Sequence, residues 1–184
     1  MVKLYKNFNI NNHHKNSIIL IGNFDGLHLG HQKLFKLALS YKKKYNSKIG
    51  VINFDPMPKM YFNNSLKNFK ISSVNQKLEL LKELKVDFII TKKFDKNFSK
   101  IKSIKFIKEI LYKKLNCKFI FVSNNFRFGN KREGDVKLLL QNEKNYNYKV
   151  IKPKPLLKSK KIVSSTIIRN LLEKGNLNRA NKFL

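Results

Sequence analysis

Five short apolar runs alternate with amphipathic segments along the chain, and this alternation constrains the fold more than any other feature. The apolar runs have the length of strands and cover residues 17–24, 48–54, 86–90, 118–122 and 148–151. Segments with helical periodicity lie between them, at residues 29–44, 75–84, 104–115 and 136–145. Short buried strands that alternate with helices are typical of a parallel sheet covered on both faces. The sequence therefore predicts an α/β fold with a Rossmann-like, five-stranded parallel sheet.

Three unusual loops follow predicted strands, at residues 22–31, 54–62 and 123–130. Because the carboxyl ends of parallel strands meet at one edge of a sheet, we expect these loops to gather there and to bind a ligand. The sequence shows no internal repeat and no interdomain linker, so its 184 residues are expected to form one domain.

The first of these loops is rich in glycine, contains two histidines and opens a predicted helix. It reads Gly22-Asn23-Phe24-Asp25-Gly26-Leu27-His28-Leu29-Gly30-His31. The first amides of a helix have no partner within the helix, and its dipole favours an anion, while glycines let the backbone come close to a ligand. A histidine pair alone is common, but its place at a strand-to-helix junction favours a phosphate site. Zinc is less favoured, since the other candidate ligands are His13, His14 and Cys117.

A second helix start lies near the end of the chain. It reads Val163-Ser164-Ser165-Thr166-Ile167-Ile168-Arg169, and the helical periodicity ends at Gly175. Serine and threonine are good N-cap residues, so one interpretation is an ordinary capped helix with a solvated arginine. The other is a second phosphate site, in which Arg169 donates charge-assisted hydrogen bonds to phosphate oxygens. Two such helix starts in one α/β domain suit a nucleoside triphosphate.

The formal net charge of +29 suggests nucleic acid, but its distribution argues against a specific nucleic-acid site. The basic residues are 36 Lys and 4 Arg, and they are scattered along the whole chain. Asn and Ile are also abundant, and these three residues share A- and T-rich codons, so compositional drift explains the excess more simply. We expect only weak, unspecific binding of polyanions at low salt.

The sequence contains no apolar run of about 18 residues and no signal-peptide pattern at Met1, so no membrane partner is expected. Cys117 is the only cysteine, which excludes internal disulfides and favours a reducing compartment, the cytoplasm.

Four motifs in a fixed order carry a resemblance to a known family. They are the Gly22–His31 loop, Phe54-Asp55-Pro56-Met57-Pro58, Phe126-Arg127-Phe128-Gly129, and Ser164-Ser165-Thr166-Ile167-Ile168-Arg169. Together they resemble the FMN adenylyltransferase module of the bacterial bifunctional riboflavin kinase/FAD synthetase, over almost the whole chain. The resemblance implies a nucleotidyltransferase that makes FAD and pyrophosphate from ATP and FMN with Mg²⁺. It also implies that residues 1–184 form this domain without the riboflavin kinase domain that usually follows, so kinase activity is not expected.

The resemblance also implies roles for individual residues. His28 and His31 would be the catalytic donors to the α- and β-phosphate oxygens. The residues implied in ATP binding are Gly22, Asn23, Phe24, Gly26, His28, His31, Ser164, Ser165, Thr166 and Arg169. The residues implied in FMN binding are Phe54, Pro56, Pro58, Phe62, Asn125, Phe126 and Phe128. No Mg²⁺ ligand can be assigned from the sequence, because this ion keeps most of its waters when it bridges phosphates.

Three positions depart from the family pattern. Met57 stands where a histidine is usual, Ser123 where a glycine is usual, and Asn125 where an aspartate is frequent. The first departure removes a polar contact expected near the acceptor, and the third removes a charge but keeps hydrogen-bonding capacity.

Two alternatives to an FAD synthetase remain open at this point. One is a related nucleotidyltransferase that acts on phosphopantetheine, nicotinamide mononucleotide or a cytidylyl acceptor. The Pro-x-Pro turn and the Phe-Arg-Phe-Gly motif argue against it. The other is a non-catalytic domain that binds a nucleotide or RNA, and the intact histidines and Ser-Ser-Thr motif argue against that. The sequence gives no indication of the oligomeric state.

Overall fold

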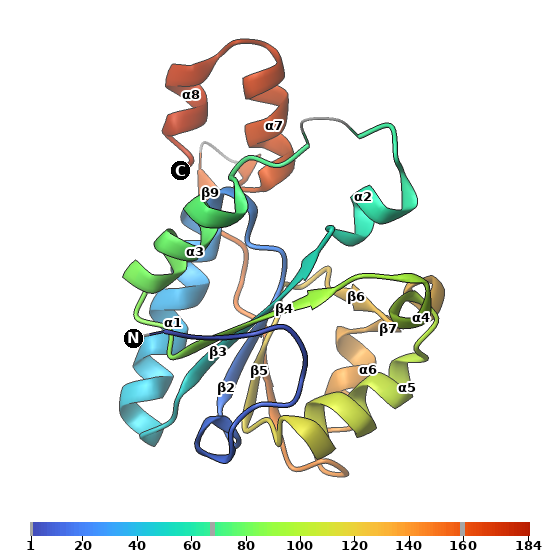
Figure 1. Ribbon diagram of the computed structural model, residues 1–184. Helices are drawn as coiled ribbons and strands as arrows, with labels where there is room; N and C mark the ends of the chain where they lie inside the picture. The colour runs from blue at the N-terminus through green and yellow to red at the C-terminus, as the bar shows by residue number, and fades with distance from the viewer. Residues whose placement is uncertain (1, 67–68, 159–160) are drawn as a thin grey trace.

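The computed structural model describes residues 2–66, 69–158 and 161–184, and its centre is a six-stranded sheet (Figure 1). Every neighbouring pair of strands in this sheet is parallel. In spatial order the strands are β1 (Lys3–Tyr5), β4 (Phe88–Lys93), β3 (Ile49–Asp55), β2 (Ile18–Ile21), β5 (Phe119–Phe121) and β8 (Lys149–Ile151). The predicted α/β fold is confirmed, with one strand more than the five predicted.

The additional strand is β1, which pairs with β4 at the edge of the sheet through the register Leu4 to Ile89. Its three residues are exposed or only partly buried, and one is a lysine, so they do not form an apolar run. An edge strand of this kind gives no period-two signal, because it buries little of either face.

The sheet is buried on both faces because its side chains alternate between two cores. Ile19 and Ile21 of β2 belong to one core, while Ile18 and Leu20 of the same strand belong to the other. The first core is completed by η3 (Phe106–Lys114), which directly follows the short α5 (Ser103–Lys105), and by α6 (Val136–Gln141). The second is completed by α1 (Leu29–Tyr45) and α3 (Val74–Glu83), on the opposite side of the sheet (Figure 1).

Capping residues mark the ends of α3 and α1. Ser73 and Gln76 form a reciprocal capping box at the start of α3, and Asn46 ends α1 in the left-handed conformation. The helix predicted over residues 104–115 is the short α5 followed by η3, a π-helix. The helix predicted over residues 136–145 ends at Gln141, where the side-chain amide of the next residue, Asn142, donates to the Leu138 carbonyl.

Several short elements were not predicted. The segment after β3 contains α2 (Pro58–Phe62), and α4 (Lys96–Ser99) follows β4. Two small antiparallel hairpins pair β6 (Arg127–Phe128) with β7 (Gly134–Asp135) and β9 (Leu157–Lys158) with β10 (Lys161–Ile162). Three 3-10 turns are η1 (Asn12–His14), η2 (Asp25–Leu27) and η4 (Asn130–Arg132).

The chain ends in two helices, α7 (Ser165–Glu173) and α8 (Leu177–Asn181), which pack on each other beyond the carboxyl edge of the sheet (Figure 1). The helix start predicted within the Ser-Ser-Thr segment is confirmed, and Ser164 is the residue that caps α7. In the described part of the chain, no helix has the length and apolar character needed to cross a bilayer.

Candidate functional site

A cleft of about 550 Å³ lies at the carboxyl ends of β2 and β5, between the loop after β2 and the start of α7. It brings together most of the residues implied in ATP binding, namely Gly22, Asn23, Phe24, His28, His31, Ser164, Ser165, Thr166 and Arg169. Asn125 and Phe126, from the set implied in FMN binding, line the same cleft. Segments that are 140 residues apart are in direct contact here, since the Ser165 hydroxyl donates to the Asp25 carbonyl at 3.1 Å.

Gly26 does not line this cleft. It has a φ of +74°, and a Cβ built on it would lie 2.8 Å from Cγ2 of Ile71. Gly26 therefore allows the loop to turn and to pack against the segment before α3, rather than allowing a ligand to approach. Phe24 lines the cleft but is buried, and its ring packs edge-on against His31 and Phe35.

The remaining residues implied in FMN binding lie outside this cleft. Phe128 is buried and packs between Phe106 and Phe126, stacking on the latter at 5.4 Å. Phe54 is half-buried, with its ring between those of Phe94 and Phe98. Phe62, in contrast, is 69% exposed at the end of α2. Pro56 and Pro58 lie at the start of this segment and are partly exposed.

His28 is the N-cap residue of α1 and one wall of the cleft. Its Nδ1 accepts the His31 amide N–H at 3.3 Å, a bond that the amide shares with the His28 carbonyl oxygen. Because Nδ1 is an acceptor, the proton of the neutral ring is on Nε2, which makes Nε2 a donor. The His31 ring stacks on the His28 ring at 3.6 Å, and its buried Nδ1 has no partner within the described residues.

Both histidines are neutral at physiological pH. Burial lowers the pKa of His28 to about 4, and the nearby Arg169 charge acts in the same direction. Burial also lowers the pKa of His31 well below its usual value, with a smaller contribution from His28. The pair can therefore donate hydrogen bonds to an anion as neutral imidazoles, without a change of protonation state.

Three backbone amides at the two helix starts are available to an anion. In α1, the Leu29 amide donates to the Phe183 carbonyl and the His31 amide to His28. In the part of the chain that is described, the amides of Gly30, Ser165 and Thr166 have no hydrogen-bond partner, and these three residues line the cleft. Unpaired amides at helix N-termini are typical phosphate donors.

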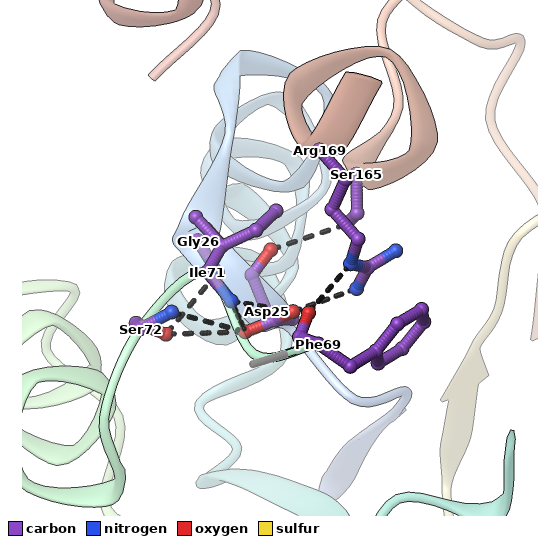
Figure 2. A network of polar contacts seen from close by, with 7 residues as sticks. All are labelled: Asp25, Gly26, Phe69, Ile71, Ser72, Ser165 and Arg169. Atoms are coloured by element: carbon purple, nitrogen blue, oxygen red, sulfur yellow. Dashed lines mark hydrogen bonds and ion pairs between the residues drawn. The ribbon is translucent and has the colours of Figure 1, made fainter. Parts of the chain in front are cut away.

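Asp25 and Arg169, which both line the cleft, form a largely buried ion pair at 2.6 Å between Oδ2 and Nη2 (Figure 2). Asp25 is 2% exposed, and its carboxylate also accepts the amides of Ile71 and Ser72. Sequence reasoning gave Asp25 no role. The available signal was an acidic residue between glycines and apolar residues, in a chain with only 11 acidic residues.

Lys77 of α3 is a second charged residue that sequence reasoning did not single out. It is 8% exposed, and burial lowers the pKa of its ammonium group. The opposite charges of Asp25 and Asp55 partly offset this effect. A desolvated lysine beside the loop that carries the histidines adds positive potential to this end of the sheet.

The departures from the family pattern have different structural settings. Met57 is 1% exposed, so the position where a histidine is usual is packed into the protein interior. Ser123 and Asn125 are exposed at the cleft, where the Ser123 hydroxyl donates to Oδ1 of Asn125 at 2.9 Å. Of the three departures, those at Ser123 and Asn125 therefore alter groups that a ligand in this cleft would meet.

The histidines considered for zinc do not converge. His14 lies beside β1, where its Nδ1 is 2.8 Å from the Tyr5 hydroxyl, and Cys117 is buried in the core. Over residues 2–66, 69–158 and 161–184, no group of three His, Cys, Asp or Glu side chains is arranged to hold a metal ion.

A comparison with models of protein families identifies the family of this chain. The model of the FAD synthetase family matches residues 10–167, which include the loop after β2 and the start of α7. The chain belongs to the FAD synthetase family. The resemblance carried by the four sequence motifs is thereby confirmed.

Curated relatives of this family member are bifunctional riboflavin kinase/FMN adenylyltransferases. The protein of Buchnera aphidicola subsp. Schizaphis graminum is 41% identical, over 96% of this chain and 57% of its own length. The Escherichia coli K12 protein is 32% identical, over 91% of this chain and 53% of its own length. The chain thus spans about half the length of the curated relatives it matches.

Two solved structures have a similar fold to this chain. A Streptococcus pneumoniae protein described as a macrolide-efflux protein superposes with a TM-score of 0.82 at 26% identity, over 100% of this chain and 61% of its own. Pantoate-beta-alanine ligase from Francisella tularensis superposes with a TM-score of 0.56 at 15% identity, over 99% of this chain and 86% of its own. The second similarity concerns the fold alone.

Proposed function

We propose that this chain is an FMN adenylyltransferase, which transfers AMP from ATP to FMN and releases pyrophosphate. The observation that carries the proposal is the convergence of two helix starts and a neutral histidine pair on one cleft. A triphosphate placed there meets the Nε2–H of His28 and the amides of Gly30, Ser165 and Thr166, which have no hydrogen-bond partner among the described residues. The membership in the FAD synthetase family supports ATP and FMN as the substrates.

The chemistry needs no general base. An oxygen of the FMN phosphate attacks the α-phosphorus of ATP, and the bond from that phosphorus to the bridging oxygen of the β-phosphate breaks. Because the nucleophile is already an anion, catalysis consists of alignment and of stabilising the charge that develops on the phosphate oxygens. His28 and His31, which burial keeps neutral, are suited to donate hydrogen bonds to those oxygens. The start of α7 then meets the charge of the leaving pyrophosphate.

The flavin is proposed to lie on the side of the cleft formed by Asn125 and Phe126. Phe128 supports this wall from behind, since its ring stacks on Phe126. The exposed Phe62 and the two prolines near α2 provide an apolar surface of the kind that a flat ring requires. Phe54 is assigned to the packing beneath that surface.

Mg²⁺ is proposed to arrive with ATP. Asp25 is an acidic residue that lines the cleft, and it already accepts hydrogen bonds from Arg169 and from two amides. Because this carboxylate is already occupied, the cleft would suit an ion held mainly by the nucleotide and by water rather than by protein ligands. The ion would neutralise part of the charge of the triphosphate.

We place the activity in the cytoplasm, where the buried thiol of Cys117 stays reduced.

The test is product formation from a panel of acceptors. The purified chain is incubated with ATP and Mg²⁺, and with FMN, nicotinamide mononucleotide or phosphopantetheine, and the products are separated by chromatography. FAD from FMN alone supports the proposal, whereas a product from another acceptor supports a related nucleotidyltransferase. No product from any acceptor, with ATP bound, supports a non-catalytic domain. Riboflavin with ATP is expected to give no FMN from residues 1–184.

A further inference from the structure

The segment of residues 69–72, here called the strap, lies just before α3 and contacts Asp25 in the Gly22–His31 loop, here called the ATP loop. Its backbone is tied to the Asp25 carboxylate, which accepts the Ile71 amide at 3.0 Å and the Ser72 amide at 3.2 Å. The Ser72 hydroxyl is shared between that carboxylate and the Gly26 amide, which donates to it at 3.2 Å. The strap is therefore anchored to the loop that carries the histidines.

Arg169 fastens the same strap from the other side (Figure 2). Its Nε donates to the Phe69 carbonyl at 2.8 Å, its Nη2 donates to Asp25 at 2.6 Å, and its guanidinium lies 3.8 Å from the centre of the Phe69 ring. Its Nη1 makes no hydrogen bond to any described residue, and Arg169 lines the cleft. Two of its three nitrogens are thus committed to the strap and the ATP loop.

The strap in turn contacts the elements proposed to hold the flavin. The Phe69 ring packs against Arg169, and the Lys59 ammonium of α2 lies over the same ring in a cation–π contact, 5.0 Å from its centre. Lys70 forms an ion pair of 2.8 Å with Asp55, the last residue of β3, which directly precedes Pro56. A continuous set of contacts thus leads from Asp25 through Arg169 and Phe69 to α2.

We propose that Asp25 and Arg169 are positioning residues for the FMN side of the reaction. Their ion pair fixes the strap, and the strap fixes α2 and the Pro56 turn relative to the ATP loop. This inference rests on the proposed function. It also changes the role of Arg169, because a guanidinium whose charge is balanced by a buried carboxylate attracts a triphosphate less than an unpaired one.

Removing the Asp25 charge is therefore expected to weaken the binding of FMN and not that of ATP. In Asp25→Asn the strap amides lose a charged acceptor, so the KM for FMN rises by about tenfold. The positive charge of Arg169 is no longer balanced, so the dissociation constant for ATP stays the same or falls. A substitution that merely loosened the fold would weaken the binding of both substrates.

The experiment measures both constants in wild type, Asp25→Asn, Phe69→Leu and Asp87→Asn, together with hydrogen exchange of the strap. Phe69→Leu removes the ring between Arg169 and Lys59 without burying a new charge, so it tests the inference even if Asp25→Asn does not fold. Asp87→Asn is the matched control, since Asp87 pairs with Lys42 at 2.7 Å and accepts the Ile49 amide, at the opposite edge of the sheet.

The expected result is a raised KM for FMN in Asp25→Asn and Phe69→Leu, with ATP binding kept and with faster exchange of the Ile71 and Ser72 amides in Asp25→Asn. Asp87→Asn should leave both constants and the strap unchanged. Equal weakening of both substrates, or a raised KM for ATP alone, would overturn the inference while leaving the proposed function intact. A wild-type chain that makes no FAD would instead overturn the proposed function.

Discussion

His28 combines two tasks in one side chain. Its Nδ1 caps α1, which leaves the proton of the neutral ring on Nε2, and the residue lines the cleft. The substitution His28→Asn separates them, because asparagine is a good N-cap residue but has no group that reaches as far as Nε2. We expect His28→Asn to bind ATP with little change and to lose roughly 10²-fold in turnover, since the lost donor acts on developing charge. Initial rates of FAD formation and ATP titration measure this, and an unchanged rate would remove His28 from the mechanism.

Burial of His28 also makes folding stability depend on pH. The pKa of His28 is lowered to about 4 in the folded chain, from 6.5 for the free side chain. Above pH 6.5 the His28 side chain is neutral in both the folded and the unfolded chain. As the pH falls from 6.5 to about 4, only the unfolded chain takes up the proton, so the free energy of unfolding decreases over this range. From pH 7 to 5 this residue accounts for roughly 2 kcal/mol. Urea unfolding at both pH values should show a smaller loss in His28→Asn than in wild type, and equal losses would contradict the assigned burial.

At the scale of elements, the start of α1 depends on the absence of a side chain at Gly30. A Cβ there would lie 3.1 Å from the His28 ring and 3.3 Å from the Val163 carbonyl, just before α7. Gly30→Ala is therefore expected to displace the histidine and reduce turnover about tenfold, because small misplacements of a donor weaken catalysis.

The control for Gly30→Ala is Gly175→Ala. Gly175 has a φ of +69°, and a Cβ added to it would meet no atom within 4 Å, so alanine there strains only the backbone. It should lower the thermal midpoint without changing turnover. If both variants lose turnover in proportion to stability, Gly30 has no specific role in placing His28.

The sequence predicts elements well where local signals and burial agree. The runs that became β2, β3 and β5 are apolar because both faces of the sheet are covered, and α7 begins within the predicted Ser-Ser-Thr segment. The edge strand β1 and the packing of Met57 have no such signal, since they depend on what surrounds them in space. The contacts of the strap could not be predicted for the same reason. Asp25 and Ile71 are 46 residues apart, and neither segment contains a pattern that indicates contact with the other.

At the scale of the whole molecule, the net charge of +29 calls for a separate test. If it reflects composition alone, RNA and DNA should bind weakly, without sequence preference, and should dissociate steeply as salt rises. Filter binding of several unrelated oligonucleotides across a salt series measures this. Selective binding that persists at about 0.15 M salt would instead indicate a nucleic-acid site.

The central claim is that one cleft joins the α-phosphate of ATP to the phosphate of FMN. The most direct measurement follows the label from ATP that is radioactive at either its α- or its γ-phosphorus, with FMN as acceptor. The account predicts that the α label appears in FAD, and that the γ label appears only in pyrophosphate. Transfer of the γ label to the flavin, or no transfer of the α label while both substrates are bound, would contradict it.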